Sequence, residues 1–175
     1  TPLYSSAASD VYKRQSLYGE YANLVVLQRM AEALGHEVEV VAGENPDLSN
    51  AHLIYMGCGT EQAQKFALEG LRPQVEDLKA ALDRGAVVLF TGNAMEILGQ
   101  SITDTQGKVW QGLGLADFTT IETRQRTPHD VIANTPPGHS PVVGFLNKCS
   151  LTAGVSTPLF ESLELSLIHI SEPTR

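Results

Sequence analysis

The sequence predicts an α/β domain of three layers with a mostly parallel central sheet. Segments of helical and of strand periodicity alternate through the first half of the chain, as they do in βαβ units. The apolar segment 86–90 is continuous, which is typical of a strand buried on both faces of a parallel sheet. A length of 175 residues suffices for one domain with its own core.

The elements of the first half are predicted in order from their periodicity. Apolar residues at helical spacing predict a helix over 23–34, which Gly35 would end. Alternation predicts a strand over 36–41, and a short apolar run predicts a buried strand over 52–56. Thr60 is expected to cap the helix that follows.

The second half of the sequence begins with further alternating helix and strand signals, and beyond residue 99 these give way to short strands. A helix is predicted over 73–84, followed by the strand 86–90 and a short helix over 94–98. Beyond residue 99, glycines separate short strands predicted near 115–124, 130–134 and 141–146. The later half is therefore expected to be richer in strand and loop.

Composition and charge exclude several classes of protein. The net charge of −8, from 20 acidic and 12 basic residues, argues against a nucleic-acid-binding protein and against binding to an anionic membrane surface. No run of 18 apolar residues occurs, so no membrane span is predicted. Cys58 and Cys149 are too few for a disulfide framework, and we expect reduced thiols in a cytoplasmic protein.

The two ends of the chain differ from the interior. Residues 1–15 lack apolar periodicity, and both this segment and residues 166–175 resemble translated sequencing-adapter read-through. We therefore expect a non-native or disordered head over 1–15, a domain over 16–165 and a non-native or disordered tail over 166–175.

Two loops are candidates for a functional site. Ligands of parallel α/β sheets bind where strands end and helices begin. Gly57-Cys58-Gly59 and Thr91-Gly92-Asn93 both follow predicted strands and precede predicted helices. The helix start after Gly92 also offers an alternative role in binding an anion.

Five segments, in the same order, resemble class I glutamine amidotransferases of the CobB/CobQ-like branch, most closely the GatD-type glutaminase subunits of lipid II isoglutaminyl synthases. They are LYGEYANLVVL (17–27), LIYMGCGTEQAQ (53–64), VVLFTGNAMEILG (87–99), GLGLADF (112–118) and VVGFLNK (142–148). The resemblance implies a flavodoxin-like fold that is C-terminally truncated here. It also implies glutamine as substrate, no cofactor, and a Mur-ligase-like (MurT-like) partner that receives ammonia to amidate the peptidoglycan precursor lipid II.

The family's chemistry needs a cysteine on a tight strand-to-helix turn, a histidine base oriented by an acid, and a glycine-rich oxyanion loop. This chain departs from that pattern, because Gly92, followed by Asn93, occupies the cysteine position. The family's histidine and acid lie beyond residue 165. Glutaminase activity is therefore doubtful, and the alternatives are an inactive interaction or regulatory subunit and a cobyric-acid-type amidation protein.

The remaining candidates each have a functional and a structural interpretation. The resemblance places Gly57, Cys58 and Gly59 in the oxyanion loop, where Cys58 is either a replacement nucleophile or a small turn residue. Arg126 either binds a substrate carboxylate or is solvated. Glu20 and Asn23 lie either at the active-site mouth or at a helix start. Glu96 is expected to face solvent. No metal-ligand spacing is present.

Overall fold

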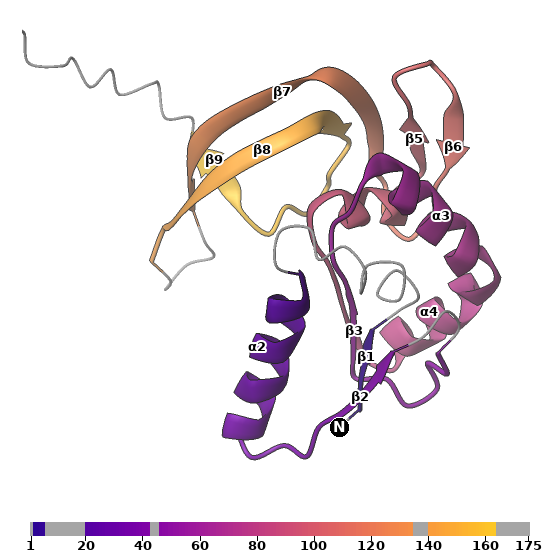
Figure 1. Ribbon diagram of the computed structural model, residues 1–175, viewed down its shortest axis with the longest axis vertical. Coiled ribbons are helices and arrows are strands. Elements are labelled where there is room, and N and C mark those ends of the chain that lie inside the picture. Colours follow the sequence, from indigo (N-terminus) through magenta and orange to yellow (C-terminus); the bar gives the residue numbers. More distant parts are fainter. Residues whose placement is uncertain (1, 6–19, 43–45, 135–139, 164–175) are drawn as a thin grey trace, which may run out of the picture.

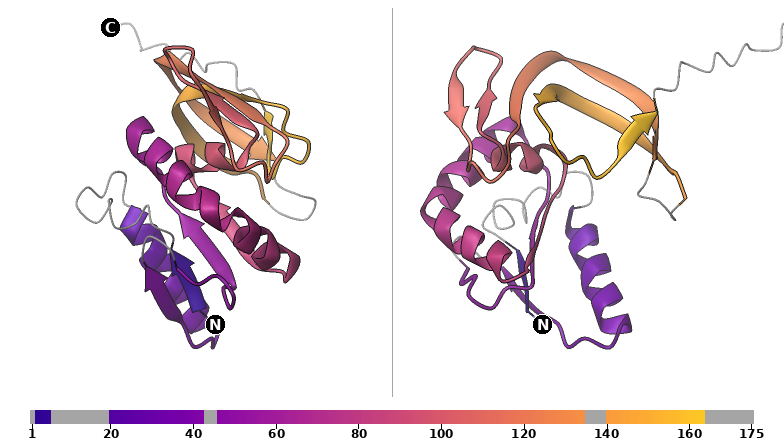
Figure 2. Two further views of the ribbon diagram at one scale, coloured as in Figure 1. Left: turned by 90° about the vertical axis from the view of Figure 1, so that its right-hand side faces the viewer. Right: turned by 180° about the vertical axis from the view of Figure 1, so that it is seen from behind.

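The computed structural model describes residues 2–5, 20–42, 46–134 and 140–163, which form two sheets (Figure 1). The first sheet carries the two candidate loops, which follow its neighbouring strands. In both views of Figure 2 the second sheet lies beyond one end of the first.

The first sheet has four strands, all parallel, in the order β2-β1-β3-β4. Its strands are β1 (Pro2–Ser5), β2 (Glu39–Ala42), β3 (Leu53–Met56) and β4 (Val87–Phe90). Three of these strands, β2, β3 and β4, overlap the strands predicted over 36–41, 52–56 and 86–90. The ladder between β3 and β4 pairs Met56 with Phe90, so the two strands end side by side.

Helices cover both faces of this sheet, which gives the predicted three layers. Figure 1 shows α2 (Glu20–Ala33) on one face and α3 (Glu61–Leu71) and α4 (Val75–Asp83) on the other. The 3-10 turn η2 (Arg72–Gln74) joins α3 to α4. As predicted, Thr60 caps α3 by accepting a hydrogen bond from the Ala63 N–H at 3.2 Å.

The prediction that residues 1–15 lie outside the fold is wrong for residues 2–5. These residues form β1, which pairs with β2 on one side and β3 on the other. The inner edges of β2 and β3 carry N–H and C=O groups that need partners, and β1 supplies them. Four residues are too few to show a periodicity. Residues 6–15 and the predicted tail 166–175 lie outside the described part of the chain.

The second sheet is mostly antiparallel and has the order β6-β5-β7-β8, with β9 also paired to β7. Its strands are β5 (Ser101–Thr103), β6 (Val109–Gln111), β7 (Thr119–Asn134), β8 (Val142–Ala153) and β9 (Glu161–Leu163). The segments predicted as two strands, 115–124 and 130–134, overlap the single strand β7, which begins at Thr119. A register shift between Glu122 and Thr127 interrupts the alternation on which the prediction depends.

The core lies between the first sheet and the layer of α3 and α4, and it extends under η3 (Gly92–Leu98). η3 follows β4, contains the short helix predicted over 94–98, and is a 3-10 helix. Core residues are contributed by β3, β4, α3, α4, η3 and β5 and by the segments that connect these elements. They are Leu48, Ala51, Ile54, Met56, Ala67, Leu68, Leu71, Leu78, Ala81, Ala86, Phe90, Ala94, Ile97, Ile102 and Leu113.

Two glycines allow the chain to cross itself where the sheets meet. A β-carbon on Gly112 would lie 2.1 Å from the carbonyl oxygen of Gly99. A β-carbon on Gly99 would lie 2.5 Å from the carbonyl oxygen of Phe118. Since both obstacles are backbone atoms, neither position accepts a side chain at this crossing.

Candidate functional site

The two candidate loops leave the same edge of the first sheet, as the sequence predicts. β3 and β4 are parallel neighbours, and the Thr91 N–H donates to the Met56 carbonyl at 2.9 Å just past the last ladder pair. The segment Gly57-Cys58-Gly59 follows β3, and Gly92-Asn93 follows β4. The loops that the resemblance assigns to the oxyanion and nucleophile positions are therefore adjacent.

Asn93 fastens one loop to the other through its carboxamide. Its Oδ1 accepts from the Gly59 N–H at 2.9 Å, and its Nδ2 donates to the Gly59 carbonyl at 2.8 Å. This pair of hydrogen bonds uses both polar groups of the glycine backbone. The Gly59 N–H, a candidate oxyanion donor, is consequently engaged by a side-chain amide of the chain itself.

The backbone of Gly92 lies next to the side chain of Cys58. Its φ is +55°, a left-handed conformation that favours glycine. A β-carbon placed on Gly92 would lie 2.5 Å from Cys58 Cβ and 3.4 Å from Cys58 Sγ. The side chain of Cys58 therefore fills the space that a side chain at position 92 would need. Cys58 and Cys149 are both half-buried, and neither of these two described residues forms a disulfide.

Glu96 does not face solvent, contrary to the prediction. Only 6% of it is exposed, and its carboxyl oxygens accept from Gln64 Nε2 at 2.7 Å and from Ser150 Oγ at 2.5 Å. Gln64 Nε2 also donates to the Asn93 carbonyl. Buried polar groups need such partners, and these bonds join η3 to α3 and β8.

A buried ion pair lies beside this cluster. Lys65 Nζ pairs with Glu122 Oε1, linking α3 to β7, and also donates to Gln64 Oε1 at 2.6 Å. We call Gln64, Lys65, Glu96, Glu122 and Ser150 the polar seam. Sequence reasoning missed it because its partners come from different elements, as with Glu96 and Ser150, which are 54 residues apart.

Asn23, one of the two residues predicted at the mouth of the site, contacts the first sheet. Asn23 Nδ2 donates to the Tyr55 hydroxyl on β3 at 3.2 Å, which ties α2 to the sheet. Glu20 is the first residue of α2, and its side chain is outside the described part of the structure. A role for these two residues in substrate binding stays a prediction.

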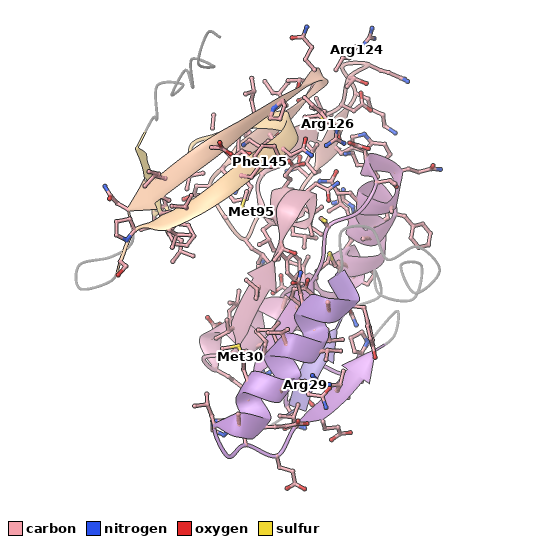
Figure 3. The ribbon with its side chains drawn as sticks, turned by 60° about the vertical axis from the view of Figure 1, so that its left-hand side comes forward. Arg29, Met30, Met95, Arg124, Arg126 and Phe145 are labelled. Atoms are coloured by element: carbon pink, nitrogen blue, oxygen red, sulfur yellow. The ribbon has the colours of Figure 1, made fainter. Side chains whose placement is uncertain are left out.

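Arg126 lies on the second sheet, at the register shift of β7. It is exposed, and its Nη1 donates to the backbone carbonyl and to Oδ1 of Asn147 on β8 at 3.3 and 3.4 Å. Figure 3 shows Arg126 on the second sheet and Met95 on η3, where the two sheets approach. These hydrogen bonds run across the β7–β8 ladder, so the predicted carboxylate-binding role stays a prediction.

The described residues offer neither a metal cluster nor a membrane-spanning helix. Within the described ranges, no three His, Cys, Asp or Glu side chains are grouped so as to hold a metal ion. No helix in the described part of the chain is long and apolar enough to span a membrane.

Comparison with known proteins agrees with the geometry. Residues 11–163 match the CobB/CobQ-like glutamine amidotransferase domain. Over 134 residues the chain is 26% identical to the lipid II isoglutaminyl synthase (glutamine-hydrolyzing) subunit GatD of Streptococcus pneumoniae, an alignment that covers 74% of this chain and 52% of that protein. The chain thus spans about half the length of this relative. The family match covers most of the chain, which therefore belongs to the CobB/CobQ-like glutamine amidotransferase family.

Proposed function

We propose that this chain is the amidotransferase-like component of a cytoplasmic two-subunit synthetase that amidates lipid II, with a Mur-ligase-like (MurT-like) partner. The support is its family together with its similarity to a protein named as a subunit of lipid II isoglutaminyl synthase. Since the chain spans about half of that relative, the partner and the acceptor are part of the proposal.

We further propose that the chain does not hydrolyse glutamine at its elbow. Hydrolysis needs a thiolate that attacks the amide carbon and expels ammonia, after which water cleaves the thioester to release glutamate. Gly92 has no side chain, and Cys58 fills the adjacent space. This contact is the observation that carries the proposal, and it points to a role in assembly or regulation with the ligase subunit.

The proposal is tested by co-expressing the chain with a Mur-ligase-like subunit. We expect a stable 1:1 complex on size-exclusion chromatography and no release of glutamate from glutamine above that of the ligase subunit alone. Robust turnover that persists in the Cys58→Ala variant would contradict the loss of activity, and failure to form a complex would contradict the assembly role.

A second candidate function is glutaminase activity that uses Cys58. The observation in its favour is that Cys58 Sγ lies 3.4 Å from the place where an elbow β-carbon would stand. If this candidate is correct, glutamate release is abolished by Cys58→Ala and kept by Cys149→Ala. If both variants match the parent chain, the candidate is wrong.

A further inference from the structure

We propose that positions 58 and 92 share one side-chain space, so that the site can hold a side chain at one of these positions and not at both. The distance of 2.5 Å between Cys58 Cβ and a β-carbon on Gly92 is the direct observation. Carbon atoms without a bond between them pack at about 3.5–4.0 Å, so the two β-carbons cannot coexist unless the backbone moves.

The backbone around both positions is fastened, which limits such a movement. Thr91 donates to Met56 at one end of the contact, and Asn93 holds Gly59 by two hydrogen bonds at the other. Each loop is therefore anchored on both sides of the close approach. Separating the β-carbons by an ångström would stretch or break these bonds.

Because positions 58 and 92 share one side-chain space, a thiol at position 58 requires a glycine at position 92. In this chain the thiol is on the loop after β3, and the elbow after β4 carries glycine. Introducing an elbow thiol by Gly92→Cys alone would force two β-carbons into one place. The exchange requires Cys58→Gly as well, because the obstacle is the β-carbon of residue 58 and not only its sulfur.

The steric part of this inference is independent of the proposed function and is tested by thermal unfolding. Gly107 is the matched control, since it has a φ of +84° and no atom lies within 4 Å of the place where its β-carbon would stand. Gly107→Ala measures the backbone cost of a side chain at positive φ. We expect Gly92→Ala to lower Tm at least twice as much as Gly107→Ala.

Two variants of residue 58 identify the cause of that extra loss. In the Cys58→Gly background, Gly92→Ala should cost no more than Gly107→Ala, because the opposing β-carbon is gone. In the Cys58→Ala background the β-carbon is kept, so the full loss should persist. Equal losses for Gly92→Ala in the two backgrounds, or a loss no larger than that of Gly107→Ala, would overturn the inference.

Soluble yield replaces Tm if Gly92→Ala fails to fold in the parent chain. Recovery of folded protein by Cys58→Gly and not by Cys58→Ala supports the shared space, and the same yield in both backgrounds overturns it. None of these measurements uses glutamine or a partner, so their failure is distinguishable from failure of the proposed function.

Discussion

The two sheets of this protein are built in opposite ways. The first has parallel strands of four residues with helices on both faces, and most of the core belongs to it. The second has strands of up to 16 residues, and many of its large apolar side chains are exposed, including Val143, Phe145 and Leu151. The candidate site lies on the first sheet, and the polar seam joins it to the second.

The difference indicates what each part contributes. The first sheet fixes the two loops of the site through its ladder and through the half-buried Asn93–Gly59 hydrogen bonds. The polar seam instead places charged and polar groups in buried surroundings, where it joins α3 and η3 to the long strands β7 and β8. Substitutions in the polar seam should therefore lower the free energy of unfolding more than loss of the Asn93–Gly59 hydrogen bonds does. Measured unfolding free energies can confirm or reverse that order.

Loss of the buried ion pair should have the largest effect. Glu122→Ala leaves the Lys65 ammonium buried without its carboxylate, and we expect a loss of about 3–5 kcal/mol in the free energy of unfolding, measured by chemical denaturation. Glu76→Ala removes the exposed partner of Lys79 and is the matched control, with an expected loss of about 0.2–1 kcal/mol.

A paired replacement separates the loss of attraction from the burial of a lone charge. Lys65→Met with Glu122→Leu removes both charges, and we expect stability within about 1–2 kcal/mol of the parent chain. If this double variant is as unstable as Glu122→Ala, the buried charge is not the cause and the explanation of the seam is wrong.

Ser150→Ala should have the next largest effect. It removes a donor to buried Glu96, and we expect a loss of about 1–3 kcal/mol because the carboxyl oxygen gains no replacement donor from solvent. Ser156→Ala, at an exposed position of the same half of the chain, should change the unfolding free energy by less than about 0.5 kcal/mol. Equal effects would show that Ser150 does not stabilise the seam.

Asn93→Ala should cost less than Ser150→Ala although it removes two hydrogen bonds. Gly59 is half-buried, so water can replace the lost partners, and we expect about 1 kcal/mol. Asn50→Ala, at an exposed position, is the control. A loss larger than that of Ser150→Ala would reverse the proposed ranking of the two regions.

The smallest effect is expected for the pH dependence of stability that arises from Asp104. The hydrogen bond from Trp110 Nε1 to Asp104 Oδ2 is the largest cause that holds the pKa of Asp104 below its ordinary value of 3.8. Because the folded pKa is lowered, the associated stability is present above that ordinary value and is lost as the pH falls through the folded pKa.

Trp110 is the chain's single tryptophan, so its fluorescence reports this titration directly. We expect the signal to change with a midpoint below 3.8 in the parent chain and to lose that transition in Asp104→Asn. A midpoint at or above 3.8 would show that the Trp110 hydrogen bond does not favour the charged carboxylate.

Much of the first sheet could be predicted from the sequence because its signals are local. Thr60 caps α3 as expected, and Gly35 and Gly85 end their helices with φ values of +86° and +91°. The two loops of the site could also be located, since both follow apolar strands. β1 is the exception, because a four-residue strand has no measurable period.

The polar seam and the Cys58–Gly92 contact could not be predicted in the same way. Lys65 and Glu122 are 57 residues apart, and their meeting depends on how two sheets pack. The resemblance identified Gly92 as the elbow position, but only the three-dimensional arrangement shows that Cys58 fills the space beside it.

The crossing of Gly99 and Gly112 has a consequence for the comparison of distant relatives. At 26% identity, the pairing of residues between two chains is easily shifted by a position or more. A chain that keeps this crossing must place glycine at both points, since a side chain there would meet backbone. The pair therefore provides a fixed reference for aligning the second half of the domain, where the spacing of strands alone gives none.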